Sequence, residues 1–454
     1  MKKNKNSMAL RTIALVVLLA ALTCIIILRF KAPNDSPNID PSEDYMDDPP
    51  QQEEPEPEEV FIVLGGKIID PSVANLQLEP EVTVNELESV IPELKFLEIV
   101  DAQQCLFSDT EKRKLIADHP DVQFLWDICI GDLVCSSEQT SLSIPDPECI
   151  DEYTAFADLL PNIMVIELCG GDYTPQQASS IAAAWPGAHL TGMLTMFGQS
   201  FSTDTEELDF SGTPISLEQT EEFSSLISAM PALKKVVMSD CGIKDEDMDA
   251  LDQKYESVRF VWTVHFKVYS VRTDTDRFCV SDLPWNNYVA WPMTDKDFAP
   301  IKYCRDLVAL DLGHENISDL SFLYNMPKLR YLIIAIEHNI FDLTPVASLQ
   351  DLYYLEVFNN ELLDISPLAE CKNLKHLNIS NTRGDFSIEP LFQMTQLDRL
   401  WFALNHLTEE EKEALRTALP DTEIYLEQDD SVGGSWRSSP VYDELRTALF
   451  APGH

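Results

Sequence analysis

The sequence predicts an α/β solenoid with a parallel β-sheet on its concave face and short helices or 3-10 turns on its convex face, preceded by one transmembrane helix. A motif of the form L-x-x-L-x-[LIVF] recurs at near-constant intervals in the C-terminal half, and a longer interval recurs in the N-terminal half. Such periods are typical of stacked units, because one short unit cannot bury its apolar face alone. An uninterrupted apolar run at 12–28 predicts the membrane helix.

The first residues predict a membrane anchor. Residues 12–28 contain no charged residue, and four basic residues precede them whereas two follow closely. The larger basic cluster is expected to stay in the cytoplasm. We therefore predict a cytoplasmic basic tail at 1–11, a transmembrane signal anchor at 12–28, and a single-pass protein of the cell membrane whose remaining chain is extracytoplasmic. A cleaved signal peptide is the main alternative, and a lipoprotein anchor at Cys24 is a weaker one.

The next segment, residues 32–59, predicts a disordered linker. It holds 11 acidic residues, seven prolines and no lysine or arginine. A segment of this composition cannot bury enough apolar surface to fold. Because proline and like-charge repulsion both extend a chain, the linker is expected to hold the solenoid away from the membrane.

Residues 60–264 are predicted to form three composite units of long, helix-bearing repeats, followed by a connecting segment at 265–306. A proline stands ahead of the strand in each unit, at the nearly evenly spaced positions Pro92, Pro161 and Pro231. Capping-box patterns at Ser108–Glu111 and Thr174–Gln177 predict that helices follow the first two strands. The strands are expected in the runs Leu94-Lys-Phe-Leu97-Glu-Ile99, Ile163-Met-Val-Ile166-Glu-Leu168 and Leu233-Lys-Lys-Val236-Val-Met238.

Residues 307–426 are predicted to form short repeats, and residues 427–454 to fold over the last of them as a cap. So short a unit holds one short strand and leaves room for only a single helical turn on the convex side. A capping box at Thr408–Glu411 predicts a closing helix. The leucines that open the repeats are Leu307, Leu329, Leu352, Leu374 and Leu397.

These motifs resemble two groups of bacterial proteins. The short repeats, with D-[IL]-[ST]-P-L segments such as residues 364–368, resemble the leucine-rich repeats of internalins and related surface proteins. The order of pieces after residue 60 resembles membrane-anchored leucine-rich-repeat proteins of Firmicutes, with matching stretches at 260–264, 271–274, 306–313 and 431–437. The resemblance implies a leucine-rich-repeat fold and a location at the membrane, without implying a reaction.

The internalin resemblance also implies a ladder of buried asparagine side chains, eight residues after each opening leucine. Asn360 and Asn405 stand at two of these positions, whereas Glu315, Glu337 and Thr382 stand at the others. We therefore expect the ladder to be incomplete.

Composition and motifs argue against nucleic-acid binding and catalysis. A net charge of −45 on 454 residues disfavours a nucleic-acid partner. The eight histidines are scattered, and no metal-ligand, P-loop or nucleophile-elbow motif is present, so we predict no enzyme, no cofactor and no metal site. Among the cysteines, Cys241, Cys304 and Cys371 are expected to be packing residues. Disulfides are expected among three cysteines of one loop-rich stretch, namely Cys129, Cys135 and Cys149.

The predicted binding surface is the outer face of the short-repeat sheet. Aromatic residues and arginine on a polar sheet match the composition of interaction hot spots. An equally weighted alternative is that the aromatic side chains only stabilise neighbouring strands. The outward positions are Asp311, Tyr331, Ile333, Tyr354, Glu356, Phe358, His376, Asn378, Arg399 and Trp401.

A second, weaker candidate is the tripeptide Arg383-Gly384-Asp385, which resembles the integrin-binding motif of adhesive proteins and lies in a predicted turn. Turns also require residues that accept a positive φ, which explains Gly384 without a binding role.

Together these observations predict a membrane-tethered extracytoplasmic protein that recognises a protein or a cell-wall polymer through its sheet face. The runner-up is a structural or shielding component of the cell envelope that binds nothing. An enzyme with an unrecognised site is the third interpretation.

Overall fold

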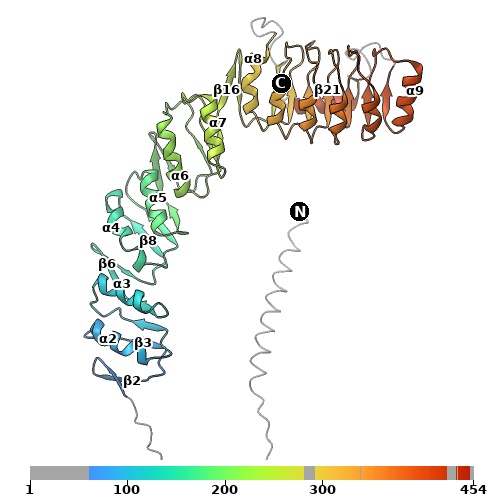
Figure 1. Ribbon diagram of the computed structural model, residues 1–454. Coiled ribbons are helices and arrows are strands. Elements are labelled where there is room, and N and C mark those ends of the chain that lie inside the picture. The colour runs from blue at the N-terminus through green and yellow to red at the C-terminus, as the bar shows by residue number, and fades with distance from the viewer. Residues whose placement is uncertain (1–60, 281–291, 338, 427–435, 437, 450–454) are drawn as a thin grey trace, which may run out of the picture. The chain divides into compact units, whose positions relative to one another are not determined.

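The computed structural model describes residues 61–280, 292–337, 339–426, 436 and 438–449 (Figure 1). The predicted basic tail, membrane anchor and acidic linker lie outside these residues. Within the described ranges, no helix is both long enough and apolar enough to cross a membrane.

The N-terminal part consists of three parallel sheets of three strands each, and an antiparallel hairpin follows every sheet. A further hairpin, β1 (Ile62–Leu64) with β2 (Lys67–Ile69), precedes the first sheet. The sheet strands are β3 (Asn75–Gln77), β4 (Ile99–Asp101), β5 (Gln123–Leu125), β8 (Ser141–Ile144), β9 (Val165–Leu168), β10 (His189–Thr191), β13 (Glu207–Asp209), β14 (Lys235–Val237) and β15 (Arg259–Val261). The hairpin strands are β6 (Asp127–Ile130), β7 (Leu133–Ser136), β11 (Met193–Met196), β12 (Gln199–Ser202), β16 (Thr263–Phe266) and β17 (Tyr269–Arg272).

Helices connect the parallel strands. The predicted capping boxes are confirmed: the carboxylate of Glu111 accepts a hydrogen bond from the Ser108 N–H at 2.8 Å, and Thr174 forms the same reciprocal pair with Gln177. These helices and 3-10 turns are α2 (Val84–Val90), η1 (Ile91–Glu93), α3 (Asp109–Asp118), η2 (Pro147–Cys149), α4 (Ile150–Thr154), η3 (Ala157–Leu159), α5 (Pro175–Ala184), η4 (Glu218–Glu222), α6 (Phe223–Ala229) and α7 (Asp245–Lys254).

The strand of the first unit lies three residues later than predicted. Val100, rather than Leu97, pairs across the sheet in the buried row, between Leu76 and Phe124. Leu94 instead ends the 3-10 turn η1, where it is buried. Leu97 and Val100 are both apolar and lie three residues apart, so the motif fits two strand registers. The 3-10 turn η1, which precedes the strand, is compatible with the later register.

The hairpins that follow the three-stranded sheets were not predicted, although a buried hydroxyl side chain follows each of them. The residue after each second strand is a buried serine or threonine whose hydroxyl bonds to the backbone before the hairpin. Ser137 accepts from the Trp126 N–H at 3.1 Å, Thr273 accepts from the Trp262 N–H at 3.2 Å, and Thr203 donates to the Leu190 carbonyl at 2.8 Å. The serine or threonine that recurs at this position is the sequence pattern from which the hairpins could have been predicted.

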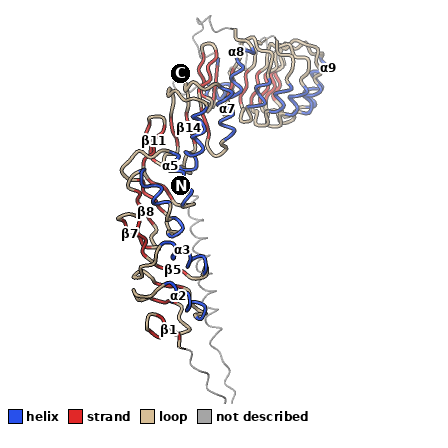
Figure 2. Tube along the Cα trace, turned by 60° about the vertical axis from the view of Figure 1, so that its left-hand side comes forward, coloured by secondary structure: helices blue, strands red, loops and turns tan. Residues whose placement is uncertain are grey.

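The C-terminal part is one parallel sheet of seven strands (Figure 2). The register places the central repeat leucines in a single row, as the repeat period predicts, and all five are fully buried: Leu310, Leu332, Leu355, Leu377 and Leu400. The strands are β18 (Arg277–Cys279), β19 (Ala309–Asp311), β20 (Tyr331–Ile333), β21 (Tyr354–Glu356), β22 (His376–Asn378), β23 (Arg399–Trp401) and β24 (Glu423–Tyr425).

Short helical turns cover the convex side of this sheet, because so short a repeat has no room for more. They are α8 (Asp295–Phe298), η6 (Ala299–Tyr303), η7 (Ser321–Asn325), η8 (Thr344–Ser348), η9 (Ser366–Glu370), η10 (Glu389–Gln393) and the longer α9 (Glu409–Ala418), which begins at the predicted capping box. One more helix, α10 (Pro440–Leu449), follows the repeats.

The expectation of an incomplete side-chain ladder is wrong at the glutamates. The Glu337 N–H donates to Asn360 Oδ1 at 2.9 Å, and the carboxylate of Glu337 accepts from the N–H groups of Glu315 and Ile317, each at 3.2 Å. Glu315 in turn accepts from the Met293 N–H. A carboxylate thus replaces the asparagine carbonyl as acceptor, and the ladder runs on through both glutamates.

Burial of these two glutamates disfavours their charged form. Burial raises the pKa of Glu337 to about 8 and that of Glu315 to about 7, although the backbone N–H groups that they accept from act in the opposite direction. Ionisation of these two glutamates therefore makes the stability of the ladder depend on pH near neutrality.

None of the nine cysteines in the described part of the chain forms a disulfide bond. The packing role predicted for Cys241, Cys304 and Cys371 is confirmed, since all three are buried. The disulfides expected among Cys129, Cys135 and Cys149 are not seen. Cys129 lies opposite Val134, whereas Cys135 lies opposite Ile128, so the two side chains point to opposite faces of the hairpin.

Candidate binding face

The ten predicted surface residues all lie on or directly after strands β19 to β23, on the face opposite the leucine row. Two rows of cross-strand neighbours flank the leucines. One row continues from Ala309 through Tyr331, Tyr354 and His376 to Arg399. The other consists of Asp311, Ile333, Glu356, Asn378 and Trp401. The sequence prediction therefore brings together residues that are neighbours in space.

The structure differs from the expected exposure of this face. Asp311, Ile333 and Arg399 are half-buried. The other seven are buried, namely Tyr331, Tyr354, Glu356, Phe358, His376, Asn378 and Trp401. Parts of the predicted surface are thus covered rather than open to solvent.

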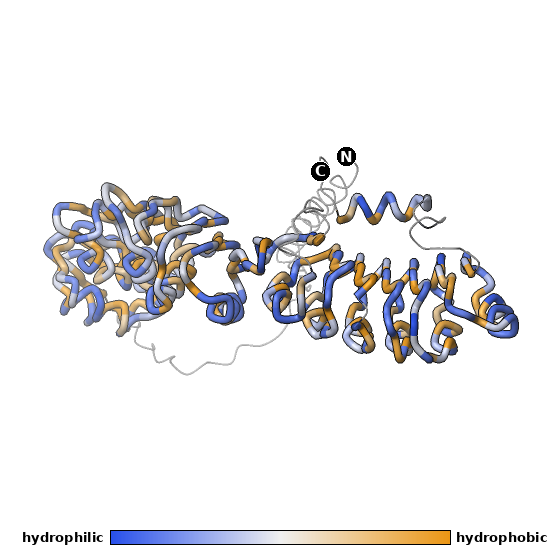
Figure 3. Tube along the Cα trace, turned by 90° about the horizontal axis from the view of Figure 1, so that it is seen from above, coloured by the Kyte–Doolittle hydropathy of each residue, from blue (hydrophilic) through white to orange (hydrophobic). Residues whose placement is uncertain are grey.

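Helix α10 provides part of this cover. Its residues Val441, Leu445 and Leu449 form one hydrophobic cluster with the face residues Tyr331 and Tyr354, and this cluster is separate from the main core. Figure 3 shows α10 lying along the repeats. We expected this segment to cover the last repeat, but α10 instead contacts β18 and β19 at the first strands of the sheet.

Polar contacts fix the position of α10. The Tyr331 hydroxyl donates to Glu444 Oε1 at 2.7 Å, and Arg277 donates to the Thr447 carbonyl at 3.4 Å. Burial, together with the neighbouring Glu444 carboxylate, raises the pKa of Tyr331 to about 12. Tyr331 therefore stays protonated and acts as a donor to the helix.

Ahead of α10, Trp436 occupies the middle of the face. Its indole N–H donates to the Tyr354 hydroxyl at 2.7 Å, and its ring packs against Phe358 at a centroid distance of 6.3 Å. Tyr354 is fully buried, and burial raises the pKa of its hydroxyl well above the usual range. The Tyr354 hydroxyl also donates to Glu356 at 3.1 Å, so an aromatic and polar network holds Trp436 in place.

Strands β22 and β23 present buried polar atoms without partners. His376 Nδ1, Asn378 Nδ2 and Trp401 Nε1 are all buried and make no hydrogen bond. Burial lowers the pKa of His376, which favours the neutral ring. Asn378 and Trp401 are cross-strand neighbours, and His376 is two residues before Asn378 on the same face. An unmatched buried donor is costly, so this area is suited to a group that accepts hydrogen bonds.

The tripeptide Arg383-Gly384-Asp385 is exposed. Gly384 has a structural reason, because its φ is 129° and a Cβ would lie 1.8 Å from the Leu362 carbonyl oxygen. The glycine is therefore required by the backbone, whether or not the turn binds anything.

One arrangement of catalytic residue types occurs at the hairpin of β16 and β17. His265 lies 2.8 Å from Asp240 through Nε2 and 2.9 Å from Ser270 through Nδ1, and all three residues are exposed. The hairpin of β11 and β12 has the same arrangement with Thr195 in place of the histidine, 3.2 Å from Asp172 and 2.8 Å from Ser200. Because threonine cannot act as a base, the repeated arrangement is explained by bracing of the hairpin.

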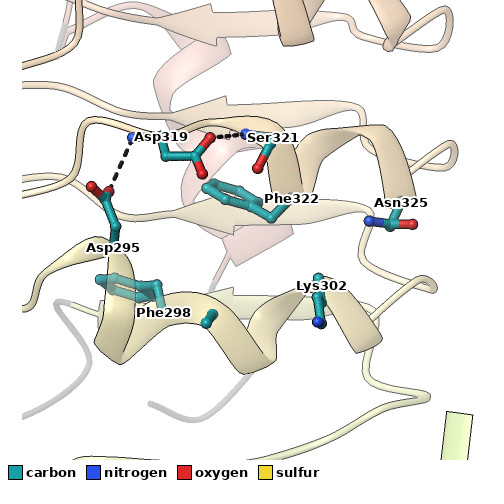
Figure 4. A pocket seen from close by; sticks show the side chains of 8 residues that line it. Asp295, Phe298, Lys302, Asp319, Ser321, Phe322 and Asn325 are labelled. Atoms are coloured by element: carbon teal, nitrogen blue, oxygen red, sulfur yellow. Dashed lines mark hydrogen bonds between the residues drawn. The ribbon is translucent and has the colours of Figure 1, made fainter. Parts of the chain in front are cut away.

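A pocket of about 160 Å³ lies between the first convex turns of the C-terminal part (Figure 4). Asp295 in its wall accepts from the Ser318 and Asp319 N–H groups at 2.7 and 3.0 Å, and Asp319 accepts from the Ser321 N–H at 2.8 Å. These carboxylates hold the turns together. Among the described residues, no cluster of histidine, cysteine and carboxylate side chains could hold a metal ion.

No family model and no curated protein sequence matches the chain. An internalin of Listeria monocytogenes, InlF, is 18% identical with a TM-score of 0.25, and the match covers 77% of this chain and 84% of that one. A leucine-rich-repeat protein of Leptospira interrogans is 16% identical with a TM-score of 0.25, covering 78% and 96%. The Arabidopsis receptor kinase HAESA, solved with the peptide hormone IDA and the co-receptor SERK1, is 13% identical with a TM-score of 0.21, covering 70% and 35%. The leucine-rich-repeat fold of this chain rests on its own repeat leucines and the parallel register of its strands.

Proposed function

We propose that this chain is a membrane-tethered, extracytoplasmic leucine-rich-repeat protein that binds a protein segment through the concave face of its seven-stranded sheet. The observation that carries the proposal is the face itself, which holds α10 and Trp436 through buried aromatic and polar contacts. Tyrosine, tryptophan and arginine in such a position are typical of binding hot spots. The apolar run at residues 12–28 supports the membrane tether.

A protein partner fits this face better than a cell-wall polymer. The face is apolar over β19 to β21, where Tyr331 and Tyr354 pack with leucine and valine side chains of α10. A peptide offers such side chains, whereas a glycan offers mainly hydroxyl groups. A wall polymer remains the alternative that the same assay tests.

The binding test uses the chain from Phe61 onward, which is one compact unit, immobilised and exposed to an envelope extract or to purified wall polymer. The variant Trp401→Ala changes the face, and Tyr324→Ala changes an exposed aromatic residue of the convex side as a control. We expect capture of a partner that Trp401→Ala weakens at least tenfold and Tyr324→Ala leaves unchanged. Unchanged capture by Trp401→Ala, with a lowered melting temperature, would leave this residue a structural role only.

The runner-up function is a structural component of the envelope that binds no partner. The burial of seven predicted surface residues favours it, because a face covered by its own chain needs no ligand. Failure of every variant and of the unaltered chain to retain any partner or polymer would support this second function.

The adhesive and membrane proposals have separate tests. Loss of host-cell binding in Asp385→Ala, with binding retained in Asp364→Ala, is the result expected for an adhesive turn. Resistance of the full chain to alkaline extraction from membranes is the result expected for the anchor, and its release would contradict the anchor.

A further inference from the structure

Helix α10 contacts the concave face in the way that a bound peptide helix would. Val441, Leu445 and Leu449 stand at positions i, i+4 and i+8, so that they share one side of the helix, and all three are buried. Tyr331 and Tyr354 are the face residues in the same cluster. Recognition of an amphipathic helix in a groove relies on anchors at this spacing.

Directional contacts select this helix rather than any apolar cover. The carboxylate of Glu444 receives the Tyr331 hydroxyl, and the indole of Trp436 reaches the Tyr354 hydroxyl, both at 2.7 Å. A helix that lacks the carboxylate is disfavoured, because the Tyr331 hydroxyl then loses its acceptor. The face is therefore specific for a sequence pattern.

The hydrophobic core and the strand pairing of the repeats do not depend on α10. The central leucines belong to the main hydrophobic core, whereas the apolar residues of α10 form a second cluster with Ala309, Tyr331 and Tyr354. Every strand from β18 to β24 is paired with its neighbours, and α9 packs against η10 at the end of the repeats. Release of α10 would thus uncover the face and leave the solenoid core intact.

A competing ligand would gain binding energy from polar atoms on the part of the face beside Trp436. His376, Asn378 and Trp401 present buried polar atoms that make no hydrogen bond. A partner that places a carboxylate or carbonyl group over β22 and β23 would satisfy donors there and would add binding energy to its helix contacts.

We propose that α10 is a ligand held in cis: the concave face recognises an amphipathic helix with apolar residues at i, i+4 and i+8 and a carboxylate at i+3, and α10 occupies this face until a partner helix of the same pattern displaces it. This inference rests on the proposed function and names both its partner and its regulation. Because α10 is tethered, its effective concentration at the face is high, so only a matched helix competes.

The test uses the full chain and a fluorescent peptide with the sequence of residues 436–449. In the variant Leu445→Asp, a charge at the centre of the apolar stripe releases α10. We expect this variant to bind the peptide at least tenfold more tightly than the unaltered chain does. Asp443→Ala changes an exposed position of the same helix and is expected to behave like the unaltered chain. Addition of Tyr331→Phe to Leu445→Asp is expected to weaken peptide binding about tenfold.

Two results would overturn the inference. One is equal peptide affinity, or no binding, for the unaltered chain and Leu445→Asp. The other is a fall in melting temperature for Leu445→Asp as large as that for the core variant Leu377→Ala, because α10 would then be part of the core.

Parallel capture from the envelope extract separates this inference from the proposed function. If both chains capture a partner equally, the proposed function stands and the cis-ligand fails. If Leu445→Asp binds the peptide but neither chain captures a partner, the cis-ligand stands and the proposed function fails.

Discussion

Replacement of Glu337 by glutamine should remove the pH dependence of stability that this buried residue creates. Glu337 is 1% exposed and accepts hydrogen bonds from two backbone N–H groups within the ladder. Burial raises its pKa to about 8, from an ordinary value of 4.5. Glutamine has nearly the same shape as the protonated acid but cannot ionise.

The sign and size follow from proton linkage. Below pH 4.5 the folded and unfolded chains are both protonated at this residue, so ionisation has no effect. Between pH 4.5 and 8 the unfolded chain loses the proton whereas the folded chain keeps it, and the free energy of unfolding falls by about 1.4 kcal/mol per pH unit. The full interval gives a loss of at most about 5 kcal/mol by pH 8. The loss persists above pH 8.

The assay is urea unfolding of the unaltered chain and Glu337→Gln at pH 5 and pH 8.5. At pH 5 the variant is expected to be about 1 kcal/mol less stable, because its amide nitrogen cannot accept a backbone N–H. At pH 8.5 it is expected to be more stable, by about 2 to 4 kcal/mol. Glu370→Gln, at an exposed convex position, is the control and is expected to change neither value. Parallel pH curves for the unaltered chain and Glu337→Gln would refute the reasoning.

Three further predictions concern the turns. Ile336 has a φ of 66°, which is unfavourable for a β-branched residue, and the equivalent residue of the next repeat is Asn359. Ile336→Asn is therefore expected to raise the free energy of unfolding in urea by about 1 kcal/mol. An unchanged free energy of unfolding would contradict this prediction. Gly384→Ala is expected to destabilise it by more than about 1 kcal/mol, because a Cβ meets the Leu362 carbonyl, and an unchanged melting temperature would count against the turn geometry. Asp385→Ala is expected to change stability by less than about 0.5 kcal/mol in the same measurement.

The leucine row could be predicted because a fixed period leaves only one register for the strands. A shift of one residue would turn every leucine of a strand to the opposite face. The first N-terminal unit lacked this constraint, since Leu94 and Leu97 are equally apolar and three residues apart. Only the 3-10 turn that ends at Leu94 assigns the strand to the later residues.

The ladder and the covered face depend on tertiary contacts. Spacing placed Glu337 in the asparagine position, but glutamate is usually solvated, and only burial beside free backbone N–H groups makes it an acceptor. The sequence likewise predicted that residues 427–454 pack against the repeats. It placed this segment over the last repeat, whereas α10 contacts β18 and β19. The pattern alone does not identify the surface that is covered, because a helix with one apolar side fits many surfaces.

The most direct measurement of the central claim is hydroxyl-radical footprinting of tyrosine side chains in the full chain. Tyr324 is 57% exposed and provides the reference, whereas Tyr331 is 7% exposed and Tyr354 is fully buried. If α10 closes the concave face, Tyr331 and Tyr354 will react much more slowly than Tyr324, and Leu445→Asp will raise the rate at Tyr331. Reaction of Tyr331 at the rate of Tyr324 in the unaltered chain would contradict the claim.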